Sequence, residues 1–259
     1  MTLWSRIQRL FSRSEEPASC VASDTDADDK FWQRVYSARE EYFQRHVGPL
    51  PDNILKIGHM FGVWPGGGLF VIPAQQIGDD IFAHTTFGFT NSDMPASTTV
   101  SDVEVERDEL GRVTKTSSRL QAKSHVPVAN GKAGYGYEIM LLTRGTADWP
   151  LWFLQWAAGA ELLNDTGILG RVEKYNGLTI EQIRVGESET VNVLIAKAVP
   201  PLPTGTELPN GRMDIIVATV ITDDEMQWSM ENRRDALLER LQTAGIGQIS
   251  DRNRASVLR

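Results

Sequence analysis

The stretch Gly134-Tyr135-Gly136-Tyr137-Glu138-Ile139-Met140-Leu141 alternates with the period of a β-strand. Successive side chains of a strand point to opposite faces, so the aromatic and aliphatic side chains share one face: Tyr135, Tyr137, Ile139 and Leu141. Gly134, Gly136 and Glu138 share the other face. Two glycines on one face leave a strip of bare backbone that another group can approach closely. The pattern predicts a central strand over residues 134–144.

A second stretch, Trp149-Pro150-Leu151-Trp152-Phe153-Leu154-Gln155-Trp156, begins like a helix. Asp148 can cap its N-terminus, and Pro150 suits the first turn because the amide that proline lacks would have no partner there. The residues that follow are apolar almost without interruption, and such a helix must be covered on more than one side. The pattern predicts a helix over residues 149–164 at the centre of the fold.

The remaining chain mixes strand and helix patterns without a regular βαβ alternation. Strands are predicted at residues 54–58, 69–73, 81–90, 191–199 and 213–221. Two polar strands at 97–107 and 111–122 form either a solvent-exposed hairpin or a loose insertion. Helices are predicted at 29–46 and from a capping box at Thr222-Asp223-Asp224-Glu225 to Gly245. Asn176-Gly177 predicts a hairpin turn between 171–175 and 178–180, although Ile180–Ile183 also fits a helix. These elements favour an α+β fold, with a mixed, largely antiparallel sheet flanked by helices.

The N-terminal segment differs in composition from the rest of the chain. Residues 14–29 hold six acidic and no basic residues, which predicts a disordered linker. Residues 1–13 are basic and amphipathic; a membrane-surface helix is conceivable there, but the segment is interpreted as a tail. The predicted organisation is therefore a tail over residues 1–28 and one domain over residues 29–259.

Charge and cysteine content limit the function classes. The formal net charge is −8, which argues against a nucleic-acid partner because phosphate binding needs a concentrated basic face. A basic protein fits this charge better, and the charge can also serve solubility alone. The single cysteine, Cys20, suits a reducing compartment and hence the cytoplasm. No apolar run reaches the length of a membrane span.

The spacings typical of active sites are missing. The four histidines are scattered with no pair at helical spacing, so neither a metal nor another cofactor is predicted, and no catalytic residue is assigned. Glu138 can meet a cationic group of a partner, or it can pair with an internal Arg or Lys or cap backbone amides. Asp93 can bind a partner or cap its own loop. A hydrolase that uses Glu138 or Asp93 with His84 is a weaker alternative.

Three tryptophans follow one another at helical spacing: Trp149, Trp152 and Trp156. Spacings of three and four place them along one face of the predicted helix. They are interpreted as core, or, where an edge stays exposed, as the anchor for a protein partner, because tryptophan dominates interface energetics.

Four motifs together resemble one known family. The G-[FY]-G-[FY]-E strand at residues 134–138 and the Trp149-Pro150 helix start are similar to the suppressor-of-fused domain family. The segment His84–Asp93 resembles a strand that ends in G-[LMF]-[ST]-x-x-D, and Ile249–Arg254 resembles I-[ST]-D-x-x-R. Order and spacing agree over roughly residues 45–255. The resemblance implies the same α+β architecture and gives structural roles to the motif residues: His84, Gly88, Gly134, Gly136, Tyr137, Pro150 and Asp251.

The resemblance also implies a non-catalytic, protein-binding function. Animal suppressor-of-fused proteins bind a transcription factor peptide as a strand between two domains, and this chain is expected to lack room for the second domain. Bacterial members resemble immunity proteins of polymorphic toxin systems. The expected function is therefore binding and neutralisation of a cognate toxin or effector, with Asp93, Glu138 and the three tryptophans as candidate contacts. A docking or regulatory module of a secretion system is the alternative.

Overall fold

A computed structural model describes residues 22–60, 63–95, 98–107, 113–122 and 131–259 of the chain. Its centre is a mixed sheet of eight strands in the order β1-β2-β5-β9-β7-β6, with β8 paired to β9 and β10 paired to β5. The strands are β1 (Gly68–Pro73), β2 (Ile81–Phe87), β5 (Lys132–Arg144), β6 (Leu178–Arg184), β7 (Thr190–Lys197), β8 (Gly205–Leu208), β9 (Gly211–Ile221) and β10 (Ile249–Ser250). Only the β5–β9 and β5–β10 pairs are parallel, so the predicted α+β class with a largely antiparallel sheet is confirmed.

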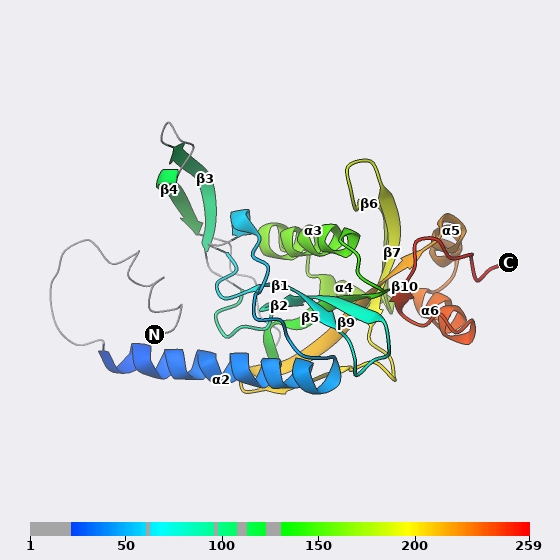
Figure 1. Cartoon of the computed structure of the whole chain (residues 1–259), viewed down its shortest axis with the longest axis horizontal. Helices are drawn as coiled ribbons and strands as arrows, with labels where there is room; N and C mark the ends of the chain where they lie inside the picture. The colour runs from blue at the N-terminus through cyan, green and yellow to red at the C-terminus, as the bar shows by residue number, and fades with distance from the viewer. Residues whose placement is uncertain (1–21, 61–62, 96–97, 108–112, 123–130) are drawn as a thin grey trace.

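Helices cover both faces of this sheet (Figure 1). The long helix α2 (Ala22–His46) lies along one face, and α3 (Trp149–Asn164) and α4 (Ile168–Tyr175) pack on the other. Helices α5 (Asp223–Glu231) and α6 (Arg234–Thr243) pack near β7, and a short 3₁₀ turn, η1 (Gly58–Met60), precedes β1. None of the helices in the described ranges is both long and apolar enough to cross a membrane.

Strand β5 separates the two halves of the core. Tyr137, Ile139 and Leu141 belong to the apolar cluster under α3 and α4. Met140 and Leu142 belong to the cluster under α2. A strand covered on both faces needs apolar residues on both, which explains why the alternation in this stretch is incomplete after Glu138. The prediction of a central strand next to a buried helix is confirmed, and the helix has the predicted bounds.

The predicted polar hairpin is also confirmed. Strands β3 (Thr98–Arg107) and β4 (Val113–Ala122) pair antiparallel as a separate two-stranded sheet. The turn between them, residues 108–112, lies outside the described residues.

One turn prediction and one helix prediction are wrong. Asn176-Gly177 does not join two strands, because Ile168, Leu169 and Val172 bury one face of α4 and Asn176 caps that helix in the left-handed conformation. The C-terminal helical segment is not continuous: α5 ends at Glu231, and α6 begins at Arg234. The break lets Met226 of α5 and Leu237 of α6 enter the same apolar cluster.

The N-terminal boundary differs as well. Helix α2 begins at Ala22, so residues 22–28 belong to a helix and not to the predicted linker. Residues 1–21, with the predicted basic amphipathic segment, lie outside the described residues.

Candidate functional site

Glu138 is fully buried at the point where β2 runs into the loop of residues 88–95. Its carboxylate accepts hydrogen bonds from Thr86 Oγ1 at 2.8 Å and from Gly88 N at 2.9 Å. It also accepts bonds from Thr90 N at 3.1 Å and Thr90 Oγ1 at 2.8 Å. All of these donors belong to one segment, so a single side chain of β5 holds this turn of the chain in place.

Arg39 of α2 supplies the positive charge for this carboxylate. Its side chain is also fully buried, and Nη1 lies 3.8 Å from Glu138 Oε1. Nη1 donates to Thr90 Oγ1 at 3.0 Å, and Nη2 donates to Asn91 Oδ1 at 2.6 Å. The guanidinium carbon stands 4.1 Å from the ring centroid of Phe87. Burial lowers the pKa of Arg39, whereas the charge of Glu138 acts in the opposite direction.

The predicted partner contact through Glu138 is therefore wrong. A fully buried carboxylate whose oxygens already accept bonds from three residues has no surface to offer a second protein. The alternative, an internal pair that holds the sheet to a neighbouring loop, is confirmed. We call Glu138, Arg39, Thr90 and Asn91 the buried ion-pair network.

The glycine strip of β5 is occupied by the chain itself. Gly134 has φ +54°, and a Cβ added there would lie 2.3 Å from the carbonyl oxygen of Phe89. The next amide, Tyr135 N, donates to this oxygen at 2.9 Å. A Cβ at Gly136 would meet the side chains of Leu169 and Lys132. The predicted close approach is real at Gly134, where the approaching group is the loop after β2, whereas Gly136 meets side chains of α4 and β5.

Gly88 serves the same loop. It has φ +121°, and an added Cβ would lie 2.7 Å from the Cα of Gly67. Its amide is one of the donors to Glu138. The structural roles expected for the motif residues Gly88 and Gly134 follow from these contacts.

A second buried carboxylate, Glu161 of α3, was not identified from the sequence. It accepts a bond from Tyr137 Oη at 2.7 Å and from the first amides of α4, Gly167 N at 3.1 Å and Ile168 N at 2.8 Å. Burial and the neighbouring Glu161 raise the pKa of Tyr137 well above its ordinary value. The signal for this role was the position of Glu161 as the only ionisable residue in an otherwise apolar helix.

A third buried carboxylate joins the C-terminal segment to α5. Glu225 takes part in the predicted capping box, which is present, and accepts Thr222 N at 3.0 Å. It also accepts Arg254 Nη1 at 2.6 Å, Arg254 Nη2 at 2.5 Å and Val257 N at 2.9 Å. The motif residue Asp251 is exposed, and it accepts the amide of Asn253 at 2.8 Å. Sequence spacing within the motif does not reveal the Arg254 pair, since its partner lies 29 residues away.

The pair of Glu225 and Arg254 makes the free energy of unfolding depend on pH in the acidic range. Burial by itself raises the pKa of Glu225, but the bonds from Arg254 and from backbone amides outweigh burial and lower the pKa below 4.5. A depressed pKa contributes stability that is present above the unfolded value and is lost as the pH falls through the folded value. We expect the urea midpoint to fall as the pH drops below about 4.5, the ordinary pKa of a glutamate in the unfolded chain. In the Glu225→Gln variant the midpoint should fall less steeply with pH. Glu231→Gln, an exposed change in the same helix, should keep the wild-type slope; equal slopes in all three proteins would contradict the assignment.

The residues of the hydrolase alternative do not come together. His84 is buried, burial lowers its pKa, and its Nε2 lies 2.8 Å from the carbonyl oxygen of Ala147. It pairs in register with Leu141, three residues along β5 from Glu138. Asp93 is exposed on the loop after β2. Within the described ranges, no group of three or more His, Cys, Asp or Glu side chains could hold a metal ion.

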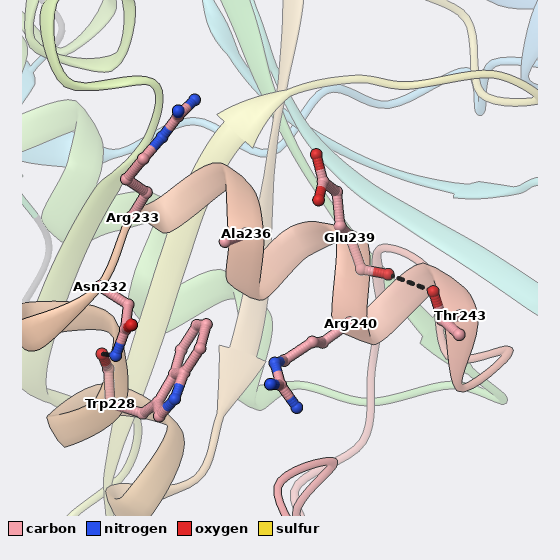
Figure 2. A pocket seen from close by; sticks show the side chains of 7 residues that line it. All are labelled: Trp228, Asn232, Arg233, Ala236, Glu239, Arg240 and Thr243. Carbon is pink, nitrogen blue, oxygen red and sulfur yellow. Dashed lines mark hydrogen bonds between the residues drawn. The ribbon is translucent and has the colours of Figure 1, made fainter.

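Two surface hollows lie elsewhere. One, of about 540 Å³, lies between α5 and α6 (Figure 2) and is lined by Trp228, Asn232, Arg233, Ala236, Glu239, Arg240 and Thr243. The other, of about 480 Å³, lies where β7, β9 and the segment 251–254 meet. Neither is lined by His84, Asp93 or Glu138, so neither supports the hydrolase alternative.

The tryptophans of α3 divide between the core and the surface. Trp149 is partly buried against the cluster under α3, and the guanidinium of Arg252 stands 5.3 Å from its ring centroid. Trp152 is 46% exposed and Trp156 is 36% exposed. Phe153 between them is fully buried. The prediction of one shared face holds for the last two, and these remain available to a partner.

The exposed face of α3 carries no charge. Its sequence has a single ionisable residue, Glu161, and that residue points inward. The outward side presents Trp152, Trp156 and Leu163, the last 41% exposed, with Gly159 between them. We call these four residues the α3 stripe. A solvated helix normally shows charged side chains on this side, so an exposed apolar stripe is unusual for a helix face that meets only solvent.

The fold and these internal networks can be compared with known proteins. The family model of the Suppressor of fused protein (SUFU) matches residues 69–255. The chain belongs to the SUFU family, known for protein-interacting regulators. A comparison with curated protein sequences gives no match.

The chain is also similar to solved structures, and the first of those named below shares its fold. A SUFU homologue from Neisseria gonorrhoeae FA 1090 is 14% identical with a TM-score of 0.52, and the match covers 88% of this chain and 97% of that one. A chain of the Sufu–Fu complex is 14% identical with a TM-score of 0.48, covering 88% and 92%. Drosophila Suppressor of Fused is 14% identical with a TM-score of 0.47, and the match covers 88% of this chain and 51% of that one.

Proposed function

We propose that this protein is a non-catalytic binding protein of the immunity type, which binds and neutralises a cognate toxin or effector protein. The observation that carries the proposal is the uncharged, tryptophan-bearing stripe on the outside of α3. Family membership supports protein binding as the general activity. The single Cys20 is consistent with action in the cytoplasm.

The use of the carboxylates supports binding over catalysis. Glu138, Glu161 and Glu225 are buried, and each accepts hydrogen bonds from backbone amides and from at least one side chain. Carboxylates in such settings stabilise the fold instead of meeting a substrate. Two other features favour a basic protein as the partner. The chain has a net charge of −8, and Asp93 is exposed on the loop after β2.

Co-expression with the toxin-like genes that neighbour this gene tests the function. We expect the protein to protect cells from one of these toxins and to be retained by it in a pull-down. Trp152→Ser with Trp156→Ser should weaken binding by roughly seven hundredfold, since tryptophans at an interface commonly contribute about 2 kcal/mol each, or about 4 kcal/mol together. Met230→Ser, a change at another exposed apolar residue on α5, is the matched control and should bind as the wild type does.

Two results would count against the proposal in different ways. Failure of every neighbouring toxin to bind the wild-type protein would reject the immunity function. Binding that survives the double tryptophan change would keep that function and move the contact away from α3.

A further inference from the structure

The surface hollow of about 540 Å³ between α5 and α6 (Figure 2) results from the break in the C-terminal helical segment. Met226 and Leu237 place the inner sides of the two helices in one apolar cluster. Trp228 of α5 and Arg240 of α6 line the hollow itself. The break therefore brings an aromatic ring and a guanidinium together at one place on the surface.

Arg240 lies over the ring of Trp228, with its guanidinium carbon 4.8 Å from the ring centroid. A cation–π contact positions the guanidinium without using any of its N–H donors in a hydrogen bond. In the part of the chain that the structure describes, these donors make neither a hydrogen bond nor an ion pair, and Trp228 Nε1 has no acceptor either. All of these donors are available to an acceptor from outside the chain.

The neighbouring acidic residues act on a different arginine. Asp235 accepts a hydrogen bond from Arg233 Nε at 3.0 Å and a second bond from Arg233 Nη2. Asp235 and, to a smaller extent, Glu239 raise the pKa of Arg233. The side chains of Glu239 and Arg240 point away from each other in Figure 2, as adjacent residues of a helix do. Among the described residues, Arg240 therefore has no acidic partner.

This lining matches a carboxylate that is carried next to apolar atoms. A carboxylate offers two acceptor oxygens to the fork of a guanidinium, in a charge-assisted pair. Trp228 and Ala236 supply apolar surface beside it. A phosphate group carries close to two negative charges and is commonly bound by a cluster of arginines. One guanidinium without an acidic partner fits the single charge of a carboxylate better.

The exposure of the lining favours a protein as the source of this carboxylate. Five of the seven lining residues are exposed, so the hollow does not enclose a small molecule as a ligand pocket does. A peptide segment that lies across α5 and α6 needs no such enclosure. Tryptophan and arginine are also the residues that most often anchor protein interfaces.

We propose that the hollow between α5 and α6 binds an acidic segment of a protein partner, in which an Asp or Glu carboxylate pairs with Arg240 beside the ring of Trp228. This surface shares no residue with the α3 stripe. Its chemistry is also opposite to that of the basic partner favoured by the net charge of −8. The inference therefore goes beyond the proposed function and adds a second binding surface.

A nuclear magnetic resonance titration of the full chain tests the proposal at the site itself. The probe is the blocked peptide acetyl-Ser-Glu-Phe-Ser-amide, and the matched probe has glutamine in place of its glutamate. The readout is the indole N–H resonance of Trp228, which is assigned by its absence from Trp228→Phe. We expect a saturable shift with the acidic peptide, a Kd of about 1 mM or lower, and binding of the glutamine peptide at least about tenfold weaker.

Variants of single arginines locate the contact. Arg240→Gln should weaken binding of the acidic peptide by about tenfold or more, and Arg240→Lys, which keeps the charge but loses the planar fork, should bind with intermediate affinity. Arg34→Gln is the matched control. The guanidinium of Arg34 stands 5.4 Å from the ring centroid of Phe31 on α2, so this variant loses the same charge and the same kind of contact away from the hollow. It should bind the peptide as the wild type does.

Four results would overturn the inference. They are an unshifted Trp228 resonance with the acidic peptide, equal affinity for the glutamine peptide, equal affinity for inorganic phosphate, and unchanged affinity in Arg240→Gln. Circular dichroism checks that each variant is folded, and the comparison of the two peptides on the wild type needs no variant. All four results leave the proposed toxin binding open, since that is measured by the pull-down.

Discussion

Glu138→Gln should destabilise the protein by about 3–5 kcal/mol, because it removes the buried carboxylate that pairs with the buried guanidinium of Arg39. The amide nitrogen of the new side chain would also face donors, since Thr86 Oγ1, Gly88 N and Thr90 N all point at the carboxylate. The measurement is urea unfolding followed by circular dichroism. We expect much of the variant to be unfolded under conditions in which the wild type is folded.

Two controls distinguish the cost of leaving a buried charge unpaired from the cost of removing a carboxylate in general. Glu173 is 41% exposed in its side chain and bonds to Lys132 and Lys197, so Glu173→Gln should cost less than about 1 kcal/mol. Adding Arg39→Met to Glu138→Gln removes the uncompensated charge and should recover part of the loss. A Glu138→Gln variant as stable as the Glu173→Gln variant would show that the buried ion-pair network contributes little.

Gly134→Ala should lower the free energy of unfolding by about 3 kcal/mol or more, because two penalties coincide. The residue has φ +54°, a conformation that alanine adopts poorly. The added methyl group would also lie 2.3 Å from the carbonyl oxygen of Phe89, a backbone atom that cannot rotate away. The urea midpoint of the purified variant measures the effect.

Gly145→Ala is the matched control for this change. Gly145 has φ +65°, close to that of Gly134, but a Cβ there would meet no described atom within 4 Å. It should cost only the conformational penalty, roughly 1–2 kcal/mol. If the two variants were equally destabilised, the clash between an added Cβ at residue 134 and the loop after β2 would contribute nothing to the loss of stability.

The central elements could be predicted because their patterns are local. Pro150 lies in the first turn of α3, and the run of apolar residues after it favours a buried helix. The alternation at Tyr137, Ile139 and Leu141 places these three side chains in one cluster. Thr222 and Glu225 form a capping box from neighbouring residues alone.

Other features depended on residues far apart in the chain. Asn-Gly at residues 176–177 favours a hairpin locally. In the structure, Leu169 and Val172 of α4 pack into the apolar core, so the residues before the dipeptide form a helix that ends at Asn176. The residues near Glu138 in the sequence do not indicate its partner. That partner is Arg39 of α2, which lies 99 residues earlier in the chain.

The amino-acid sequence by itself determined the α+β class, the central strand, the bounds of α3 and the family motifs, because side-chain periodicity and capping act between neighbours. Only the tertiary structure decided which charged residues are internal and which tryptophans face solvent. Burial depends on what packs over a residue, and for Glu138, Glu161 and Trp152 the covering or open surface is set by segments distant in sequence.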